Sequence, residues 1–590
     1  MKQFGFAYLT IIILFFAGVF TYKAFEHSKI TEKRVVLRYE ENYSLTYPET
    51  IEAYKQLDDQ FSEAKLLEYG PTDSGFPLHL FVISKHKVFN SEEVHKRNFR
   101  VLLINNGIHP GEPCGVDASV KLAREILEER NELWQLLNST VICIVPMYNI
   151  GGALNRSEFN RANQNGPEKQ GFRANAKNLD LNRDFAPMDS RNAQSFAQIF
   201  HQWAPHVFID THTSNGADYQ YVMTVIEPHP LNFPQSYGEF YSSKMEPFMY
   251  KGMENEGYPM TPYVDPMGDT PESGLEQYVS NPRYGTGYGS LFNTFTFCTE
   301  AHMFKPFRER VLATYKFMVV TLNFLKQHGA ELAVKKSEVN EYLKSKKQFV
   351  LQWELDSTKV EHFNFLGYEA EYIPSKITGG MRLKYDRSKP FIKPIPYYRH
   401  HNPKITIEKP DYYVISQTWS EVIYRLKING VKLIKLEKDT TLKVEAYYIE
   451  NYETYERPYN GHYVHFNIAV RKEIQSINLF KGDYIIPTNQ VVNEYIIQML
   501  EPQSSDSFFA WNFFDTVLQR KEYFAPYIFE DYAEEFLNSN PKLKEEFEQI
   551  KKADKQFANN PYAQLTFIYQ HSPYFEKVFM RYPVFRVFNN

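Results

Sequence analysis

Two side chains that could hold a metal ion, His109 and Glu112, lie three positions apart in the sequence His-Pro-Gly-Glu. They follow an apolar run, Val101–Ile104, which is typical of a buried strand, and the polar residues Asn105 to Gly107 end that run. The pair therefore falls on a loop at the end of a strand, where open α/β sheets place their sites. Imidazole and carboxylate are both good zinc ligands. A solvated surface loop can carry the same pair, so the motif indicates a metal site only if further ligands follow.

Two later predicted strands lead to further residues that could bind a metal ion or act in catalysis. The run His206–Asp210 predicts a strand that delivers His212 into a polar loop, and the run Phe292–Phe297 predicts one that delivers Glu300. His212 is either a third metal ligand or a histidine that caps its strand. Glu300 is either a general base or a carboxylate at the rim of the site.

A polar segment between these strands, residues 149–178, is rich in Asn, Gly and Arg and can bury little. Long polar loops inside a domain are usually functional. The segment runs on from Arg173 into Asp180-Leu181-Asn182-Arg183. Because arginine offers a planar fork to a carboxylate, two arginines with neighbouring asparagines could form an anion site here. A solvated basic loop would have the same composition.

The elements that must position these side chains alternate along the first half of the chain. Helices are predicted over 47–69, 115–137 and 308–325, and strands over 78–84, 101–104, 140–146, 206–210 and 292–297. This order predicts an α/β domain over residues 40–330, in which a mixed β-sheet is flanked by helices.

At 590 residues the chain is too long for a single core, and its second half differs in pattern. A charged, linker-like segment runs from residue 329 to Lys347. Short alternating runs then predict a β-rich accessory domain over 345–500, with one short helix over 420–429, and a helical C-terminal segment over 501–590.

Composition excludes some classes of function. The net charge of −5 gives no sign of a nucleic-acid partner, and three cysteines cannot form a disulfide framework. The apolar fraction of 43% is that of a folded chain.

The first 28 residues predict a signal peptide or an N-terminal membrane anchor. The uncharged run Phe4–Tyr22 would span roughly 28 Å as a helix, close to the ~30 Å of a bilayer's hydrocarbon. No small-residue cleavage motif precedes Lys23, which favours an anchor over a cleaved signal. We therefore expect an exported protein, attached to the membrane by this segment or secreted, with its main domain outside the cytoplasm.

Taken together, the motifs resemble those of the zinc carboxypeptidase family typified by carboxypeptidases A and B. That family has HxxE, an arginine before a D-x-N-R run, a histidine after a strand, and a glutamate near the end of the domain. This chain carries them in the same order, as His109 and Glu112, Arg173, Asp180 to Arg183, His212, and Glu300. The spacing from Arg173 to Arg183 is similar to that of the regulatory-type branch. The resemblance covers roughly residues 43–329 and leaves the remainder as a C-terminal extension.

The resemblance implies a zinc site with one ion per chain. His109, Glu112 and His212 would be its ligands, leaving the fourth position to water. Asp180 would orient a ligating histidine from behind and raise its basicity.

The resemblance also implies roles in catalysis and substrate binding. Glu300 would accept a proton from the attacking water, and Arg173 would stabilise the oxyanion. Asn182 and Arg183 would bind the terminal carboxylate of a peptide or protein, which makes the enzyme an exopeptidase.

The substrate-closing tyrosine of the family corresponds here to Tyr278. The segment after it is atypical, so Tyr284 or Tyr288 could serve instead. The position that selects the terminal side chain falls near Gly285, which selects nothing by charge.

The function implied is a zinc metallocarboxypeptidase that acts on the C-termini of peptides or proteins. One alternative keeps the zinc site but acts on cell-wall (peptidoglycan) peptides, as the predicted export suggests. Another is an inactive binding protein of the same fold, against which the complete set of ligands argues.

Overall fold

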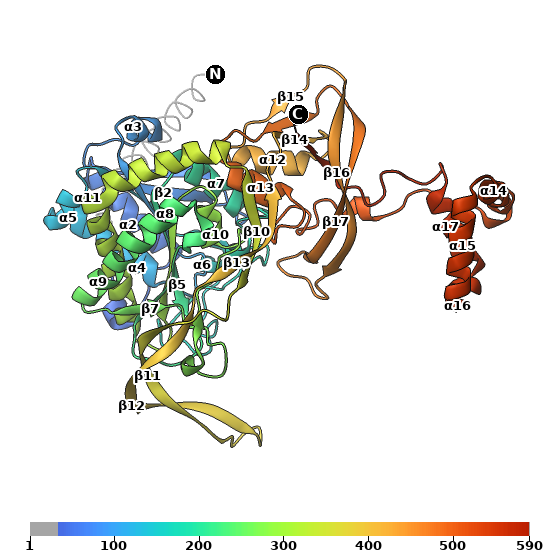
Figure 1. The fold of residues 1–590 in the computed structure, drawn as a ribbon. Coiled ribbons are helices and arrows are strands. Elements are labelled where there is room, and N and C mark those ends of the chain that lie inside the picture. The colour runs from blue at the N-terminus through green and yellow to red at the C-terminus, as the bar shows by residue number, and fades with distance from the viewer. Residues whose placement is uncertain (1–33, 589–590) are drawn as a thin grey trace, which may run out of the picture.

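The computed structural model describes residues 34–588 and is built around an eight-stranded mixed sheet (Figure 1). The strand order is β1-β2-β4-β3-β5-β9-β6-β7. The strands are β1 Ala64–Pro71, β2 Pro77–Ile83, β3 Arg100–Asn105, β4 Thr140–Val145, β5 Val207–Ser214, β6 Met223–Ile226, β7 Met260–Pro262 and β9 Phe295–His302. The four central strands, β4, β3, β5 and β9, are parallel, whereas β2 and β6 join them antiparallel. The predicted mixed sheet flanked by helices is confirmed.

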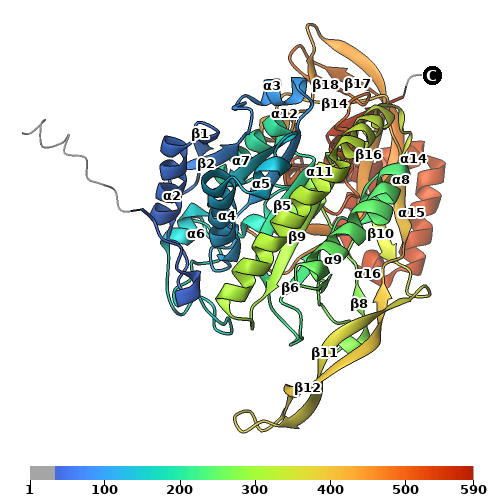
Figure 2. The same ribbon diagram turned by 90° about the vertical axis from the view of Figure 1, so that its left-hand side faces the viewer.

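Helices cover both faces of this sheet. Alternate side chains of β3 enter different cores, with Leu102 and Ile104 in one and Val101 and Leu103 in the other. The first core is covered by α2 (Tyr47–Gln60), α4 (Cys114–Arg124), α9 (Glu246–Asn255) and α11 (Phe307–Ser345), and the second by α7 (Arg191–Trp203). Strands buried on both faces have continuous apolar sequences, which made them predictable. Figure 2 shows α11 lying across the strands.

The predicted helix over 47–69 is correct only in its first part. Thr46 and Glu49 form a capping box that starts α2, and the helix ends at Gln60. Residues 64–71 instead form β1, which pairs with β2 in antiparallel register. The sheet pairing therefore overrides the helical spacing of the apolar residues. The helix expected over 115–137 is likewise interrupted at Arg130, which has a positive φ, and α5 (Glu132–Leu136) follows.

The predicted linker after residue 329 is wrong, because α11 continues without a break to Ser345. Gly329 lies inside the helix and does not end it. Leu332 and Val339 belong to the core of the sheet domain, and Leu343 belongs to the core of the β-rich part. One helix thus runs through both cores and joins the two parts directly.

The β-rich part is confirmed, and its main element is a six-stranded sheet with the order β15-β18-β14-β19-β16-β17. Its strands are β14 Tyr412–Ile415, β15 Ile434–Lys435, β16 Thr440–Thr454, β17 His465–Leu479, β18 Tyr484–Pro487 and β19 Val584–Val587. Before them come β10 (Gln348–Leu355), β13 (His401–Glu408) and a hairpin of β11 (Glu361–Pro374) and β12 (Met381–Tyr398) that projects from the body (Figure 1). Two helices, α12 (Ser420–Ile428) and α13 (Asn493–Leu500), complete this part.

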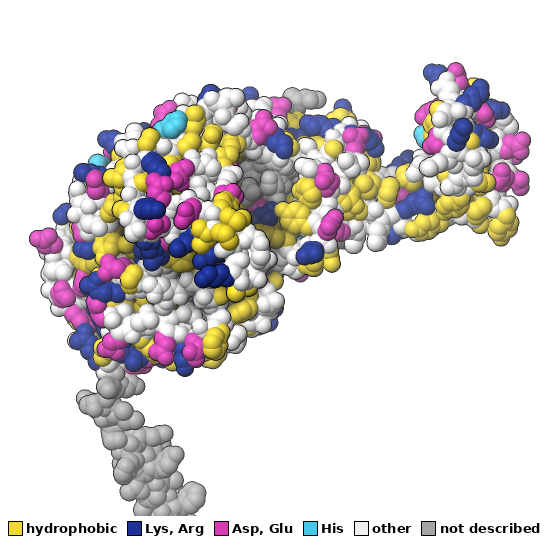
Figure 3. Space-filling model, turned by 90° about the horizontal axis from the view of Figure 1, so that it is seen from below, with side chains coloured by type: hydrophobic (Ala, Val, Ile, Leu, Met, Phe, Trp, Pro, Cys, Tyr) yellow, Lys and Arg dark blue, Asp and Glu magenta, His cyan; other side chains and the backbone are white. Residues whose placement is uncertain are grey.

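The helical C-terminal segment is confirmed for α14 (Pro526–Ser539), α15 (Pro541–Ala553), α16 (Lys555–Ala558) and α17 (Pro561–His571). These helices form a module with its own small core, and it stands apart from the body (Figure 3). The chain does not end there. Residues 584–587 return as β19, which pairs with β14 and β16 inside the six-stranded sheet.

The predicted N-terminal segment, residues 1–28, lies outside the described residues. Within residues 34–588, no helix has the length and apolar character needed to cross a membrane. The three cysteines, Cys114, Cys143 and Cys298, are buried and unpaired with one another.

Candidate active site

The parallel strands β3, β5 and β9 bring the three sequence motifs to one end of the sheet. His109 and Glu112 follow β3 on the expected loop. His212 and Glu300 lie inside β5 and β9, not in loops after them, and are direct neighbours in the parallel register. The expected strand ends at residues 210 and 297 are therefore wrong, because the pairing of β5 with β9 continues to Ser214 and His302.

Three potential metal ligands converge at this end. The Nδ1 atoms of His109 and His212 lie 3.2 Å apart, and they are 3.4 Å and 3.3 Å from Oε2 of Glu112. All three side chains are buried, and their ligand atoms lie within 4.8 Å of one another.

A carboxylate contacts the other ring nitrogen of each histidine. Nε2 of His109 donates to Oδ1 of Asp180 over 2.9 Å, and Nε2 of His212 donates to Oδ2 of Asp210 over 3.0 Å. With the proton held at Nε2, each Nδ1 directs a lone pair at the shared point. Two imidazoles and a carboxylate oriented in this way fit a catalytic zinc ion, which takes three protein ligands and keeps one position open.

Asp210 was not predicted, although the sequence carries a signal for it. Residues two apart on a strand point to the same face, so the spacing Asp-x-His places the carboxylate beside the imidazole of His212. Asn105 in turn donates to Oδ1 of Asp210 over 2.9 Å, which fixes that carboxylate in place.

Two arginines approach the remaining oxygen of Glu112, and only Arg173 was predicted. Arg173 donates through Nε to Oδ2 of Asp180 over 2.9 Å, and its Nη1 is 3.5 Å from Oε1 of Glu112. Arg161 lies closer, with Nη1 at 3.0 Å. Its side chain occupies the space over Gly111, where a Cβ would lie 3.1 Å from Cδ of Arg161. Burial acts to raise the pKa of Glu112, but His109 and Arg161 hold that pKa well below its usual range, so Glu112 is a carboxylate.

Glu300 lies beside this cluster and is nearly buried, with 8% of its surface exposed. Burial, together with the nearby carboxylate of Glu112, raises the pKa of Glu300 to about 7. The thiol of Cys298 donates to Oε1 of Glu300 over 3.4 Å. A carboxyl group that titrates near neutrality is suited to act as a general base.

A cavity of about 520 Å³ connects these groups with the predicted substrate-binding residues. It is lined by His109, Glu112, Arg173, Asn182, Arg183, His212, Tyr278 and Glu300, among others. Of the candidate residues, Asp180 and the alternative tyrosine Tyr288 do not line this cavity.

Asn182, Arg183 and Tyr284 line the same cavity. The guanidinium of Arg183 lies 4.8 Å from the ring centre of Tyr284, and Oδ1 of Asn182 accepts a hydrogen bond from the backbone of Gly285 over 3.3 Å. Among residues 34–588, no carboxylate lies within ion-pair distance of Arg183.

The structure separates the three candidate tyrosines. Tyr278 lines the cavity and donates to Asp265 over 2.5 Å, and Tyr284 lines it beside Arg183. Tyr288 is fully buried and donates to Asn429 over 2.8 Å, so it does not reach the cavity.

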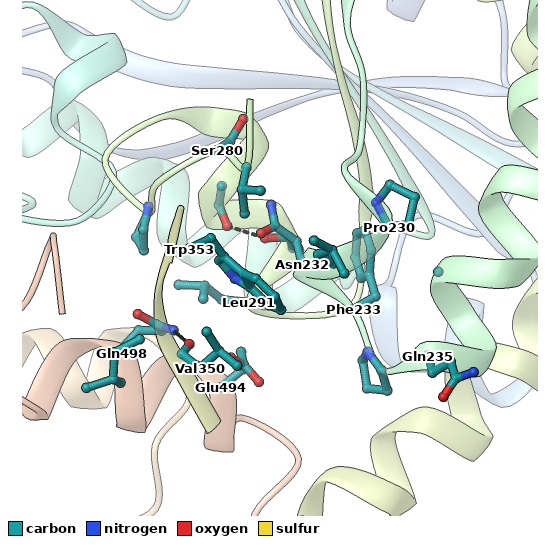
Figure 4. A pocket seen from close by; sticks show the side chains of 18 of the residues that line it. Pro230, Asn232, Phe233, Gln235, Ser280, Leu291, Val350, Trp353, Glu494 and Gln498 are labelled. Atoms are coloured by element: carbon teal, nitrogen blue, oxygen red, sulfur yellow. Dashed lines mark hydrogen bonds between the residues drawn. The ribbon is translucent and has the colours of Figure 1, made fainter. Parts of the chain in front are cut away.

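A second cavity of similar volume lies behind the strip Val279–Asn281, which also forms a wall of the first (Figure 4). Phe233, Leu291 and Trp353 supply its apolar lining, with Trp353 contributed by β10 of the β-rich part. The β-rich part therefore packs against the back of the active-site wall.

Comparison with known proteins identifies the domain. Residues 50–220 match the family model described as zinc carboxypeptidase. The chain carries a zinc carboxypeptidase domain. The match includes His109, Glu112, the Arg173–Arg183 run and His212, and ends before Glu300. Residues 50–220 thus belong to a domain of the metallocarboxypeptidase family, and this match supports the expected peptide hydrolase.

Similarity to curated relatives extends beyond the matched residues. Carboxypeptidase 2 of Trichophyton rubrum is 23% identical over 446 residues, covering 73% of this chain and 77% of the relative. Carboxypeptidase 2 of Trichophyton equinum is 22% identical over 452 residues, with the same shares covered.

Among solved structures, a metallo-carboxypeptidase from Burkholderia cenocepacia is 14% identical, covers 48% of this chain and 70% of its own, and has a TM-score of 0.35. Carboxypeptidase A from Helicoverpa armigera is 12% identical, covers 52% and 78%, and has a TM-score of 0.37.

Proposed function

We propose that this chain is a zinc-dependent carboxypeptidase that removes the C-terminal residue of peptides. The observation that carries the proposal is the combination of two features in one cavity. One is the three-donor cluster of His109, Glu112 and His212 with Glu300 beside it. The other is Arg183, an arginine that pairs with no carboxylate of the described chain. A cationic side chain left unpaired beside a hydrolytic centre is suited to bind a substrate carboxylate.

The proposed reaction uses the residues as follows. Zinc, when bound, lowers the pKa of a coordinated water to about 7. Glu300 accepts the proton of the attacking water, and Arg173 stabilises the negative charge that develops on the scissile carbonyl oxygen.

Asn182 and Arg183 bind the terminal carboxylate and so place the last peptide bond next to Glu300. Tyr284, whose ring lies against Arg183, and Tyr278, which lines the same cavity, bound the space for the terminal side chain. An internal peptide segment would leave Arg183 desolvated and unpaired, which disfavours its binding.

The test compares one peptide with a free C-terminus and the same peptide amidated, each with and without a zinc chelator. We expect release of the terminal residue from the free peptide only, and loss of that release when zinc is removed. Equal cleavage of both peptides would contradict the roles of Asn182 and Arg183. Cleavage of cell-wall fragments without cleavage of linear peptides would move the substrate to that class.

A further inference from the structure

The loop between β16 and β17 of the β-rich part reaches the back of the active site. Oδ1 of Asn460 in this loop accepts a hydrogen bond from the backbone N–H of Asp180 over 2.8 Å. The two residues are 280 positions apart in the sequence. The adjacent Gly461 also lies against the loop of the catalytic domain, because a Cβ built on it would be 4.0 Å from Cδ2 of Leu179.

Asp180 links this contact to the metal cluster, because it is hydrogen-bonded both to Asn460 and to the metal ligand His109. Its Oδ1 accepts from Nε2 of His109 and its Oδ2 accepts from Nε of Arg173. A shift of the Asp180 backbone would therefore move both the imidazole of His109 and the guanidinium of Arg173. Asn460 thus holds the backbone N–H of Asp180, while the backbone carbonyl of Asp180 accepts from the N–H of Arg183 over 3.0 Å.

A second contact lies next to two residues that line the cavity, Tyr284 and Gly285. Arg283 forms a buried ion pair with Asp506, with its Nε 2.8 Å from Oδ1, and its backbone N–H donates to Oδ2 over 2.8 Å. The rings of Tyr459 and Trp511 lie 5.2 Å and 5.1 Å from its guanidinium. The next two residues along the chain, Tyr284 and Gly285, line the cavity.

A third contact holds the far end of the 180–189 segment. Nε2 of His462 lies 2.6 Å from Oδ2 of Asp189, and Nη2 of Arg425 lies 3.0 Å from its Oδ1. The β-rich part thus contacts the Asp180–Asp189 segment at both ends, and one of these contacts is directly behind the metal cluster.

The residue type at position 460 suits this task. The backbone of Asn460 has φ of 50°, a left-handed conformation that asparagine, aspartate and glycine adopt more readily than other residues. Asparagine adds a side-chain oxygen that can accept from Asp180. Its Nδ2 is buried and has no hydrogen-bond partner among the described residues, so the oxygen is the atom that the contact uses.

We propose that the β-rich part completes the active site, with Asn460 as a positioning residue that fixes Asp180 and, through it, the metal ligand His109. This inference rests on the proposed zinc site. It assigns to the C-terminal half a role in metal binding and turnover, beyond packing against the catalytic domain.

The test uses the full chain and two substitutions that both tolerate the left-handed backbone. Asn460→Gly removes the acceptor, whereas Asn460→Asp keeps an oxygen at the same position. A matched control, His462→Gln in the same loop, removes the imidazole that contacts Asp189 and keeps the acceptor of Asn460. For each variant we would measure the dissociation constant for zinc by chelator competition, the visible spectrum of the cobalt-loaded protein, kcat and KM, and the melting temperature.

For Asn460→Gly we expect about tenfold weaker zinc binding and a comparable loss of kcat, as is typical when a residue supporting a ligand is removed. KM should change little, and the cobalt spectrum should shift because His109 is less firmly oriented. Asn460→Asp should recover zinc affinity to within about threefold of wild type, and the His462→Gln control should bind zinc like wild type.

The proposal is overturned if Asn460→Gly binds zinc and turns over like wild type. It is also overturned if Asn460→Gly and His462→Gln lose affinity and melting temperature in parallel, since that pattern reports packing alone. A wild-type chain that binds zinc but cleaves no peptide would refute the proposed function. The zinc affinities of the variants would still decide the role of Asn460.

Discussion

At the scale of single residues, each histidine of the metal cluster is oriented by a carboxylate of different origin. Asp180, which orients His109, comes from a loop 71 positions away, whereas Asp210, which orients His212, lies two positions before it on the same strand. A histidine that donates its second N–H to a carboxylate keeps one tautomer and becomes a better ligand. Both rings are therefore prepared for a metal ion by the protein alone.

Glu300 is separable from metal binding, because the ligand cluster is complete without it. We predict that Glu300→Gln binds zinc with wild-type stoichiometry but loses turnover by a factor of about 10² to 10⁴, the usual contribution of a general base. Metal content and kcat on a free peptide would be measured together. Glu239→Gln is a suitable control, because Glu239 lines the neighbouring cavity behind the Val279–Asn281 strip and should leave kcat unchanged. Full activity in Glu300→Gln would remove Glu300 from its role as base.

Sequence spacing sufficed for the residues that belong to short local patterns. His109 with Glu112, and Asp180 with Asn182 and Arg183, could be located from the sequence because each set lies within a few positions. Arg161 could not, because its partner Glu112 lies about 50 positions earlier and no local pattern marks a lone arginine in a polar loop. Asn460 is a stronger case, since only the folded chain brings it to Asp180.

At the scale of elements, the boundaries were the least predictable feature, and α11 shows the reason. Its second half has a helical spacing of buried positions at Leu332, Lys336, Val339 and Leu343. A lysine at one of these positions, among other charged residues, made the segment resemble a solvated linker. The error thus arises from a buried charge, a feature that sequence patterns treat as evidence of exposure.

Lys336 is buried in α11 and has no carboxylate within ion-pair distance among residues 34–588. Its Nζ donates to the carbonyl of Pro205 over 2.6 Å and to Oγ1 of Thr294 over 3.0 Å. The other titratable groups near it, His206 and Arg100, are basic. Burial lowers the pKa of Lys336 from its ordinary 10.5 to about 7.

This shift predicts a pH-dependent stability. Between about pH 7 and pH 10 the unfolded chain binds the lysine proton and the folded chain does not, so stability rises with pH across that window. Below about pH 7 the lysine is protonated in both states. The folded state then bears the full free-energy cost of burying the charge, a few kcal/mol.

Lys336→Met should therefore melt at a higher temperature than wild type at pH 6 to 7, with the difference shrinking towards pH 10. The loss of hydrogen bonding is small, because Thr294 still donates to the carbonyl of Pro205 over 2.8 Å. Melting temperatures across this pH range would test the expectation. Lys335→Met, at a partly exposed neighbour paired with Glu338, should give a flat difference. If Lys336→Met is less stable than wild type at every pH, the buried amine does not destabilise the folded state.

At the scale of the whole molecule, three parts differ in how tightly they are joined. Helix α11 contributes to the cores of both the sheet domain and the β-rich part, and the latter contacts the back of the active site. The helical module α14–α17 has a core of its own and stands apart from the eight-stranded sheet (Figure 1). Yet the chain passes through this module before it returns as β19, so the module is an insertion between two parts of one sheet domain.

The last prediction separates the module from the strand that follows it. The backbone N–H of Met580 donates to the carbonyl of Val517 over 3.0 Å, so the two ends of the insertion are adjacent. Replacing residues 520–577 by a short Gly/Ser linker should leave the melting temperature of the body and kcat close to those of the full chain, because β19 keeps its place.

Truncation after Leu518 removes β19 as well. It leaves Glu501 buried without Arg586, its ion-pair partner at 3.2 Å, which should cost about 3–5 kcal/mol in addition to the lost strand pairing. Thermal unfolding and turnover of both deletions would be compared with those of the full chain. If the linker variant is as unstable as the truncation, the helical module is an integral part of the fold, and its separate core does not reflect an independent unit.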